Sequence, residues 1–265
     1  MAAVYAHGKQ SAQRGKAGRS TGAARVEVRV SPRGRELRID GTFASWWAPG
    51  SPVTGGVWDV LAAPVLMLPP ARRRSLLVLG LGGGSVARVL RALAPRAQIV
   101  GVERDPEVLR AAKRRLGLAG LGVEVVEADA RVYLAKLRRR FDLIVEDLFV
   151  GSGRGVHKPD WLAGAALARL AKRLAPGGLL VSNALDEAPA TARAFAKLFP
   201  VSLCLVVRDF DNRVLVGTSM PFTAAALRGA LAREPLLAAT LPRLHVRTLT
   251  RSDRAPRSGT GARRG

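Results

Sequence analysis

Apolar stretches of strand length alternate with segments of helical periodicity through the middle of the chain. The predicted strands are residues 75–80, 98–103, 122–127, 141–146 and 178–183. The predicted helices are residues 85–93, 106–116, 130–138, 160–174 and 187–198. Strands that are joined by crossover helices predict a parallel sheet with helices on both of its faces.

The alternation changes near the end of the chain. Residues 201–208 and 213–218 are two further strand-like stretches, and only four residues separate them. Four residues cannot hold a crossover helix, so this pair is predicted to be antiparallel. A last helix is predicted at residues 222–233.

Ahead of the parallel sheet, the pattern predicts a small β-hairpin unit. Valines alternate with charged residues over 26–30, which is typical of a half-buried strand. Residues 36–47 are expected to form the returning strand, with a bend or bulge at Asp40-Gly41. A helix is expected at 57–68, where two prolines end it.

Three tryptophans, Trp46, Trp47 and Trp58, lie close together in the sequence near the end of this unit. Such a cluster can attach a small sheet to its neighbour, because large aromatic side chains bury much apolar surface. It can also form one wall of a substrate site. The sequence leaves both interpretations open.

These patterns divide the chain into four parts. Residues 1–24 mix small and basic residues without apolar periodicity, so they are expected to be a disordered basic tail. Residues 25–56 are expected to be the hairpin unit, and residues 57–235 the α/β domain. Residues 236–265 are expected to be a basic C-terminal tail.

Several classes of protein are disfavoured. No apolar run reaches the roughly 18 residues of a membrane-spanning helix, and residues 1–25 show no continuous apolar stretch of a secretory signal. Cys204 is the single cysteine, which excludes a disulfide framework and a cysteine-based zinc site. We therefore expect a cytoplasmic protein with no membrane span and no metal site.

The chain is strongly basic, with 43 Lys and Arg against 20 Asp and Glu and a net charge of +23. Much of the excess lies at the two ends, in residues 1–38 and 243–265. Such an excess attracts polyanions such as nucleic acid. Arginine outnumbers lysine by 36 to 7, however, as a GC-rich coding sequence would produce. The charge by itself therefore does not favour a nucleic-acid partner, but it does not exclude one.

A glycine-rich turn, GLGGGS at residues 80–85, lies between the first predicted strand and its helix. Glycine permits a sharp turn and a close approach of ligand to backbone, and the helix that follows offers unpaired N–H groups. Such a turn can bind a dinucleotide or a phosphate, or it can bind nothing. Ser85 stands where the dinucleotide fingerprint has its last glycine.

Acidic residues follow the next two strands. Glu103 ends the second strand, where an acid can accept hydrogen bonds from ribose hydroxyls. Asp129 follows the third strand, where a carboxylate can accept a hydrogen bond from the amine of adenine. Because strand ends of a parallel sheet share one edge, we expect both acids to line one crevice. The alternative is that such acids only cap helices.

The terminal antiparallel pair and a series of motifs resemble the spermidine synthases, within the class I S-adenosylmethionine-dependent methyltransferase superfamily. The resemblance covers about residues 25–220. Its motifs are LRIDG (37–41), VLGLGGGS (78–85), VERDP (102–106), ADARVYL (128–134), FDLIVED (141–147) and LAPGG (174–178). It implies a Rossmann-like seven-stranded sheet, parallel with a terminal antiparallel hairpin, flanked by helices and preceded by the small β unit. That unit mediates dimerisation in the family, so a homodimer is a further expectation.

The resemblance also implies how S-adenosylmethionine, or its decarboxylated form, is bound. Glu103 would hold the ribose, Asp129 and the amide of Ala130 the adenine, and the glycine turn the amino-acid end. The full set of implied cofactor-binding residues is Gly80, Gly82, Gly84, Glu103, Arg104, Asp129, Ala130 and Asp147.

In spermidine synthases, two aspartates separated by two residues follow the fourth strand. The first helps to deprotonate the attacking amine, and the second helps to hold the polyamine. Here Asp147 matches the first position, whereas Val150 stands at the second. The resemblance therefore implies Asp147 as the catalytic residue and leaves one carboxylate missing. The side chain of Glu146 is expected on the opposite face of the strand.

We therefore expect a transferase that most simply methylates a small molecule by in-line displacement at the sulfonium. One alternative is a polyamine aminopropyltransferase, since acids at the strand ends could attract an amine. A second alternative is a non-catalytic polyanion-binding protein on the same scaffold. Residues 151–159 could close over the cofactor with His157 as a base, or His157 could be an ordinary surface residue.

Overall fold

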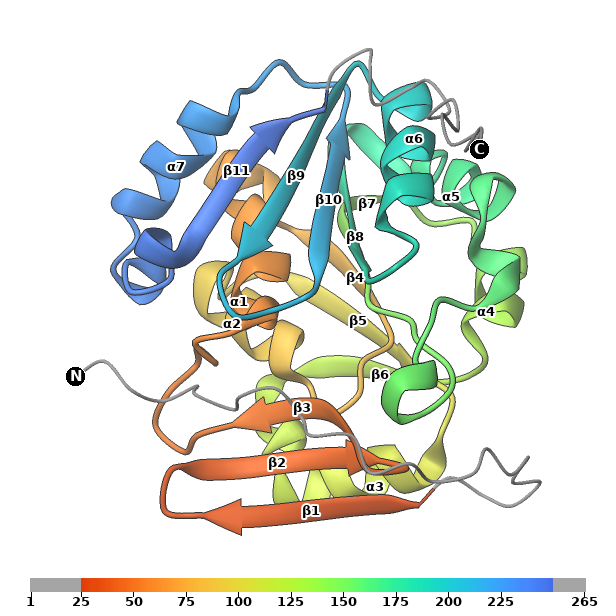
Figure 1. Cartoon of the computed structure of the whole chain (residues 1–265), viewed down its shortest axis with the longest axis vertical. Helices are drawn as coiled ribbons and strands as arrows, with labels where there is room; N and C mark the ends of the chain where they lie inside the picture. Colours follow the sequence, from red (N-terminus) through yellow and green to blue (C-terminus); the bar gives the residue numbers. More distant parts are fainter. Residues whose placement is uncertain (1–24, 250–265) are drawn as a thin grey trace, which may run out of the picture.

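The computed structural model describes residues 25–249, which form two β-sheets and the helices packed around them (Figure 1). The tail predicted at residues 1–24, and the part of the C-terminal tail beyond residue 249, lie outside the described residues. Among the residues that are described, no helix has both the length and the apolar character to cross a membrane.

The central sheet has eight strands in the order β11-β9-β10-β8-β7-β4-β5-β6. The parallel strands are β4 (Ser75–Leu79), β5 (Gln98–Glu103), β6 (Val123–Glu127), β7 (Phe141–Glu146) and β8 (Leu174–Ala184). The antiparallel strands are β9 (Val201–Val207), β10 (Arg213–Thr218) and β11 (Leu244–Thr248). The predicted parallel sheet with a terminal antiparallel hairpin is therefore confirmed.

β11 is one strand more than predicted, and it lies within residues that were expected to belong to the basic tail. Only Leu244 of this strand is buried, whereas His245 and Arg247 are exposed, so its sequence pattern hardly differs from that of a tail. The strand pairs antiparallel with β9. This pairing covers backbone groups that would otherwise form an open sheet edge.

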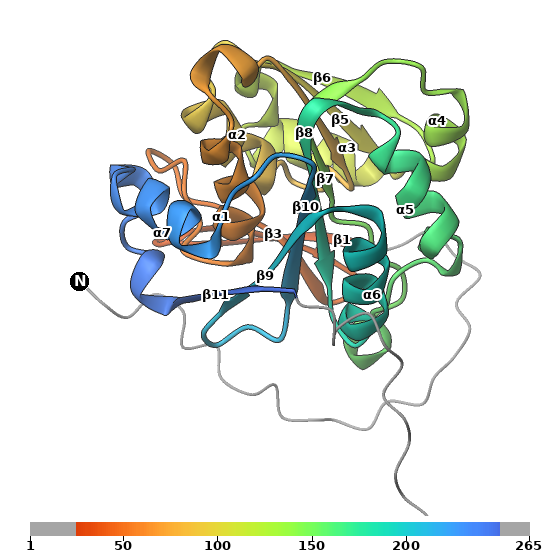
Figure 2. The same cartoon turned by 90° about the horizontal axis from the view of Figure 1, so that it is seen from above.

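Helices cover both faces of the central sheet (Figure 2). One face carries α1 (Val57–Ala62), α2 (Ser85–Leu93), α3 (Pro106–Arg115) and α7 (Ala224–Ala232), and the other carries α4 (Ala130–Lys136), α5 (Gly164–Ala171) and α6 (Ala188–Leu198). Successive side chains of β4 point to opposite faces, as strand geometry requires. Leu76 and Val78 enter one core, while Leu77 and Leu79 enter the other.

Two helices are shorter than predicted. The segment expected at 57–68 is α-helical only as far as Ala62 and continues as a 3₁₀ helix, Ala63–Met67. Pro64 accounts for the change, because proline has no N–H to donate within an α-helix. The segment expected at 160–174 begins with a 3₁₀ turn, Asp160–Leu162, before α5.

The N-terminal unit is a three-stranded antiparallel sheet rather than a hairpin. Its strands are β1 (Val26–Ser31), β2 (Gly34–Ile39) and β3 (Thr42–Trp47). The expected bend at Asp40-Gly41 is a full reversal, because both residues have positive φ, of 47° and 77°. Positive φ at two central residues is the geometry of a tight hairpin turn. The small sheet packs on α3 and lies below the central sheet in Figure 1.

Candidate cofactor and acceptor site

The glycine turn follows β4 and opens α2. Gly80, Gly82 and Gly84 have positive φ, of 82°, 52° and 85°, a conformation that residues with side chains rarely adopt. A Cβ atom on Gly80 would lie 2.4 Å from the carbonyl oxygen of Asp147. The turn therefore needs glycine at this position, and it lies directly against the residue that follows β7.

The carboxylate of Glu103, at the end of β5, reaches the same turn. Its Oε2 atom accepts a hydrogen bond from the backbone N–H of Gly82 at 3.0 Å. Its Oε1 atom accepts from the N–H groups of Arg104 and Asp105 at 2.9 and 3.1 Å. The structure thus brings together the glycine turn and the acid that the sequence singled out, while the side chain of Arg104 is exposed.

Asp129 lies after the next strand, where it caps α4. Its Oδ1 atom accepts hydrogen bonds from the N–H groups of Arg131 and Val132 at 2.8 and 3.3 Å, and the side chain is exposed. Capping is the alternative role that the sequence left open for this acid. Ala130 is the first residue of α4. A role of Asp129 and Ala130 in binding adenine stays a prediction.

The small sheet contributes two contacts to the turn that sequence reasoning missed. Ser45 of β3 is buried, and its hydroxyl accepts a hydrogen bond from the N–H of Gly83 at 2.7 Å. It also lies beside Gly82, where an added Cβ would come within 2.9 Å of the Ser45 Oγ atom. The hydroxyl of Ser85 accepts from the N–H of Trp46 and donates to its carbonyl. Ser85 therefore attaches the small sheet, which explains why serine stands in the place of a last glycine.

Asp147 lies at the end of β7 within a chain of hydrogen bonds. The Nδ2 atom of Asn183 donates to the Asp147 Oδ1 atom at 2.8 Å, and the side chain of Trp58 donates to the same carboxylate. Asn212, between β9 and β10, donates to the Oδ1 atom of Asn183 at 3.0 Å. These bonds fix both the position of the carboxylate and the orientation of the Asn183 amide.

Burial raises the pKa of Asp147 to about 6. The hydrogen bond from Asn183 and the charge of Lys158 act in the other direction, and the charge of Glu146 adds to the rise. A carboxyl group whose pKa lies near neutrality can accept a proton from a substrate and release it again. Asp147 is therefore suited to general base catalysis.

Trp58, which contacts this carboxylate, packs against a further aromatic ring. The indole of Trp58 meets the ring of Phe43 edge-on, with centroids 5.1 Å apart and an interplanar angle of 78°. Phe210, between β9 and β10, comes close to Gly56 at the start of α1. Of these three rings, that of Trp58 lies against Asp147, and Phe43 packs on Trp58.

Trp47 has a different role from Trp58. The guanidinium groups of Arg35 and Arg88 lie over its ring, 5.1 and 4.9 Å from the centroid. Arg88 belongs to α2, so its contact attaches the small sheet to the α/β unit, whereas Arg35 of β2 contacts Trp47 within the small sheet. Of the two interpretations of the tryptophan cluster, attachment fits Trp47, whereas Trp58 lies against the candidate site.

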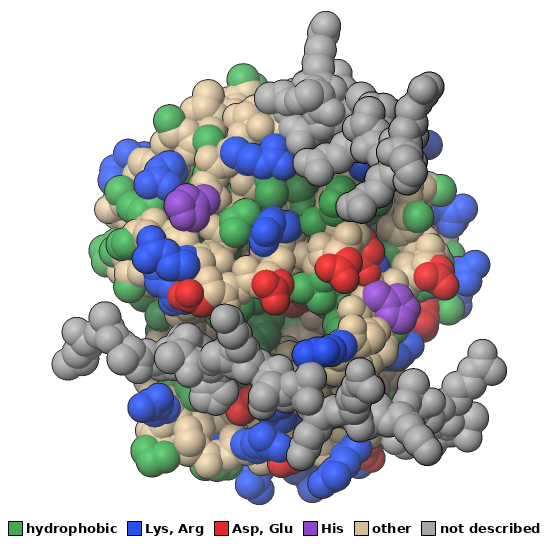
Figure 3. All heavy atoms as spheres, in the orientation of Figure 1, with side chains coloured by type: hydrophobic (Ala, Val, Ile, Leu, Met, Phe, Trp, Pro, Cys, Tyr) green, Lys and Arg blue, Asp and Glu red, His purple; other side chains and the backbone are tan. Residues whose placement is uncertain are grey.

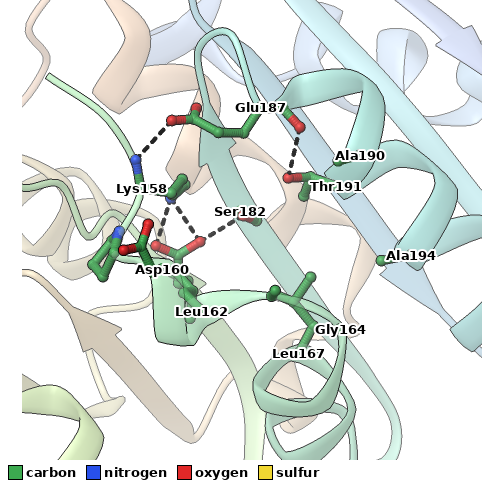
Figure 4. A pocket seen from close by; sticks show the side chains of 13 residues that line it. Lys158, Asp160, Leu162, Gly164, Leu167, Ser182, Glu187, Ala190, Thr191 and Ala194 are labelled. Atoms are coloured by element: carbon green, nitrogen blue, oxygen red, sulfur yellow. Dashed lines mark hydrogen bonds and ion pairs between the residues drawn. The ribbon is translucent and has the colours of Figure 1, made fainter. Parts of the chain in front are cut away.

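Glu146 is fully buried on the opposite face of β7, as predicted. The ammonium group of Lys158 lies 2.6 and 2.8 Å from its two oxygens, and the hydroxyl of Ser182 donates to it at 2.5 Å. Figure 4 shows this group beside a cavity of about 220 Å³ whose walls include small side chains of α5 and α6. Sequence reasoning missed Lys158, because no local pattern distinguishes a buried lysine from a surface one.

The segment between β7 and α5 folds back on itself. Val150 and His157 form an isolated antiparallel bridge with two backbone hydrogen bonds. The N–H of Gly153 donates to the hydroxyl of Thr42 at 2.9 Å, so the segment contacts the small sheet. The exposed imidazole of His157 bonds to the carbonyl of Gly155 in the same segment. Val150 is thus paired through its backbone with His157. Within residues 25–249, no group of three or more His, Cys, Asp or Glu side chains could hold a metal ion.

Comparisons with known proteins agree with this geometry. A family model described as a methyltransferase domain matches residues 76–178. A polyamine aminopropyltransferase from Vibrio vulnificus is 30% identical over 160 residues, which are 55% of this chain and 51% of that protein. A demethylmenaquinone methyltransferase from Thermus thermophilus is 32% identical over 164 residues, which are 62% of this chain and 64% of that protein. The chain thus spans between half and two thirds of the length of these two relatives.

The similarity extends to solved structures. The crystal structure of a probable spermidine synthase from Corynebacterium glutamicum superposes with a TM-score of 0.69 at 18% identity. The superposition covers 91% of this chain and 96% of that one. The chain therefore has the fold of the spermidine synthase-like class I S-adenosylmethionine-dependent methyltransferases.

Proposed function

We propose that the chain is an S-adenosylmethionine-dependent transferase. It would methylate a small molecule that binds beside Asp147. The observation that carries this proposal is the position of Asp147. Its backbone touches the glycine turn at Gly80, and its carboxylate is held by Asn183 and Trp58 at the end of β7. A proton acceptor therefore stands next to the part of the fold that is suited to hold the cofactor.

The residues of the turn fit such a cofactor. Glycine is required where the turn approaches β7, and α2 begins there without a side-chain cap at its N-terminus. The carboxylate of Glu103 accepts three backbone N–H groups in and beside the turn, and its remaining acceptor positions would take hydrogen bonds from ribose hydroxyls. When bound, the cofactor supplies an electrophilic carbon on a sulfonium. Asp129 and Ala130 would hold the adenine, and Gly82, Gly84 and Arg104 would complete the site.

Asp147 would orient the hydroxyl or amine of the acceptor and take its proton during the displacement. Positioning of this kind lowers the activation free energy by up to about 7–11 kcal/mol in ideal cases. A proton acceptor with a pKa of about 6 is largely ionised at neutral pH, so it is ready for this role. The ring of Trp58 beside Asp147 favours an apolar or planar body on the acceptor.

Aminopropyl transfer to a polyamine is the second candidate function. It is favoured by Asp147 itself and by the polyamine aminopropyltransferases among the similar proteins. A polyamine carries a second ammonium group, however, and Val150 stands where a carboxylate would hold it. The nearby Glu146 is already paired with Lys158. The valine at position 150 therefore favours methylation over aminopropyl transfer.

Calorimetric titration with S-adenosylmethionine, S-adenosylhomocysteine and decarboxylated S-adenosylmethionine tests the proposal. We expect micromolar binding of the first two and weaker binding of the decarboxylated form. Tighter binding of the decarboxylated form would favour the aminopropyl alternative. No binding of any of the three at millimolar concentration would rule out both functions. Incubation with candidate phenols, amines and polyamines, read by mass spectrometry, then identifies the group transferred.

A further inference from the structure

Basic side chains gather at the edge of the central sheet that lies opposite the candidate site. They come immediately before the parallel strands β4, β5, β7 and β8, and so lie at the amino ends of these strands. We call this group the basic edge, and its members are Arg72, Arg74, Arg96, Arg138, Arg139, Arg140, Lys172 and Arg173.

Hydrogen bonds show that the basic edge is one continuous surface. The guanidinium of Arg139 donates to the Ser75 hydroxyl at 2.9 Å and to the Gln98 side chain at 2.8 Å, which links the starts of three strands. The guanidinium of Arg173 donates to the carbonyl of Arg138 at 3.4 Å, which adds the start of β8. A hollow of about 420 Å³ between Arg140 and Lys172 opens in the same region.

The positive charges of this edge are not neutralised by neighbouring acids. Glu124 and Asp142 lie near the starts of β6 and β7, but neither forms an ion pair with the basic edge among the described residues. The carboxylate of Asp142 instead accepts the backbone N–H groups of Arg74 and Ser75. The positive electrostatic field of the basic edge therefore extends into the solvent.

One explanation of basic residues here is that they neutralise the carboxyl ends of helices, which lie at this edge. That explanation fits Arg138, which donates to carbonyls at the end of α4, and Lys172, which is the residue directly after α5. It does not account for Arg74 and Arg96, neither of which directly follows an α-helix. Their side chains are exposed and make no hydrogen bond or ion pair within residues 25–249.

We propose that the basic edge binds the phosphate backbone of a nucleic acid, on the side of the molecule opposite the candidate site. Guanidinium groups bind phosphate through two parallel hydrogen bonds, and seven of the eight residues are arginines. An anionic membrane is a poorer fit. The exposed large apolar side chains of the described residues are Val30 and Val132, neither of which precedes a strand of this edge, so nothing there would insert into lipid.

Binding of this kind is independent of base sequence, because the contacts are to phosphate only. It is also independent of the proposed transferase reaction, since the two sites lie at opposite edges of one sheet. Each phosphate contact adds about 0.9 to the slope of log K against log salt concentration.

The test compares two triple variants of the full chain by fluorescence anisotropy with a 20-base-pair DNA duplex over a range of salt. The first, Arg74→Ser/Arg96→Ser/Lys172→Ser, removes three charges that make no bond in the fold. We expect the salt slope to fall by about 2 to 3 and the affinity to fall roughly tenfold at moderate salt. Thermal unfolding and binding of S-adenosylhomocysteine should be unchanged.

The control, Arg25→Ser/Arg29→Ser/Arg33→Ser, removes three exposed charges from the small sheet, of which that of Arg29 is paired with Glu27. We expect it to change the slope by less than about 1. Equal losses in the two variants would assign the binding to net charge alone and overturn the proposal. The absence of DNA binding by the unchanged protein would also overturn it, as would binding only to phosphatidylserine vesicles, which would assign the edge to a membrane.

Discussion

Two neighbouring carboxyl groups, Glu146 and Asp147, have opposite environments because they point to opposite faces of the same strand. Glu146 is fully buried and paired with Lys158 and Ser182. Asp147 is half-buried, accepts hydrogen bonds from the neutral side chains of Asn183 and Trp58, and has a pKa that burial raises to about 6. The first arrangement stabilises a charge within the fold, and the second keeps a proton acceptor available.

Replacement Asp147→Asn tests the proposed chemistry. The amide has nearly the same shape but cannot take a proton, so we expect turnover to fall by roughly 10²–10⁴-fold while the cofactor still binds. In the unchanged protein, activity should rise with pH through about 6, because the carboxyl group with its raised pKa must lose its proton first. The variant should lack this rise. An unchanged rate and an unchanged pH profile would exclude Asp147 as the base.

Replacement Lys158→Met tests the buried ion pair. It leaves the fully buried carboxylate of Glu146 without its cation, which costs about 3–5 kcal/mol of unfolding free energy in comparable pairs. The double replacement Glu146→Gln/Lys158→Met removes both charges, so we expect it to recover much of this loss. Urea unfolding at pH 7 measures both effects. A single variant as stable as the original would show that the pair does not stabilise the fold.

At the scale of elements, three segments build the candidate site: the glycine turn, the end of β7 and the connection between β9 and β10. Strand β3 of the small sheet adds Ser45 against the turn. The family's dimerisation through the small sheet is not tested by this structure, so a homodimer stays a prediction.

Replacement Gly80→Ala tests the contact between the turn and β7. The added Cβ would lie 2.4 Å from the Asp147 carbonyl oxygen and would impose a positive φ on alanine. We expect cofactor binding to be lost and the unfolding free energy to fall by roughly 1–3 kcal/mol. Gly120→Ala is the matched control, because no heavy atom lies within 4 Å of its added Cβ. Calorimetry and chemical unfolding report both quantities, and equal behaviour of the two variants would contradict the contact.

Replacement Phe210→Ala tests the aromatic surroundings. If this ring contacts the acceptor, KM for the acceptor should rise by roughly tenfold, whereas the affinity for S-adenosylhomocysteine should not change. The neighbouring exposed residue gives a control, Asp211→Ala, which should alter neither quantity. A change in cofactor affinity with an unchanged KM would place Phe210 at the cofactor instead.

Over the whole molecule, charge is divided between the two edges of the central sheet. Acids follow the carboxyl ends of the strands, and Figure 3 shows acidic side chains in a band across the middle of the molecule. The basic edge lies at the amino ends. Parallel strands make this division possible, because residues that precede all of the strands share one edge and residues that follow them share the other.

This division predicts that the two proposed sites act independently. A saturating DNA duplex should leave the affinity for S-adenosylhomocysteine within about twofold of its value without DNA, because no coupling free energy connects separate, rigid sites. Calorimetric titration with S-adenosylhomocysteine, in the presence and absence of the duplex, measures this affinity. A tenfold change in either direction would show that the sites overlap or are coupled.

The sequence by itself determined the order and kind of most elements, the terminal hairpin, the glycine turn and the opposite directions of Glu146 and Asp147. These features depend on local periodicity and on the alternation of side chains along a strand. The tertiary structure alone decided which residues meet across the fold. Lys158 on Glu146, Ser45 on the glycine turn and Asn212 behind Asn183 join segments that are far apart in the chain. Strand β11 and the basic edge likewise exist only through pairing between distant strands, since contacts of this kind depend on register and packing and leave no local pattern.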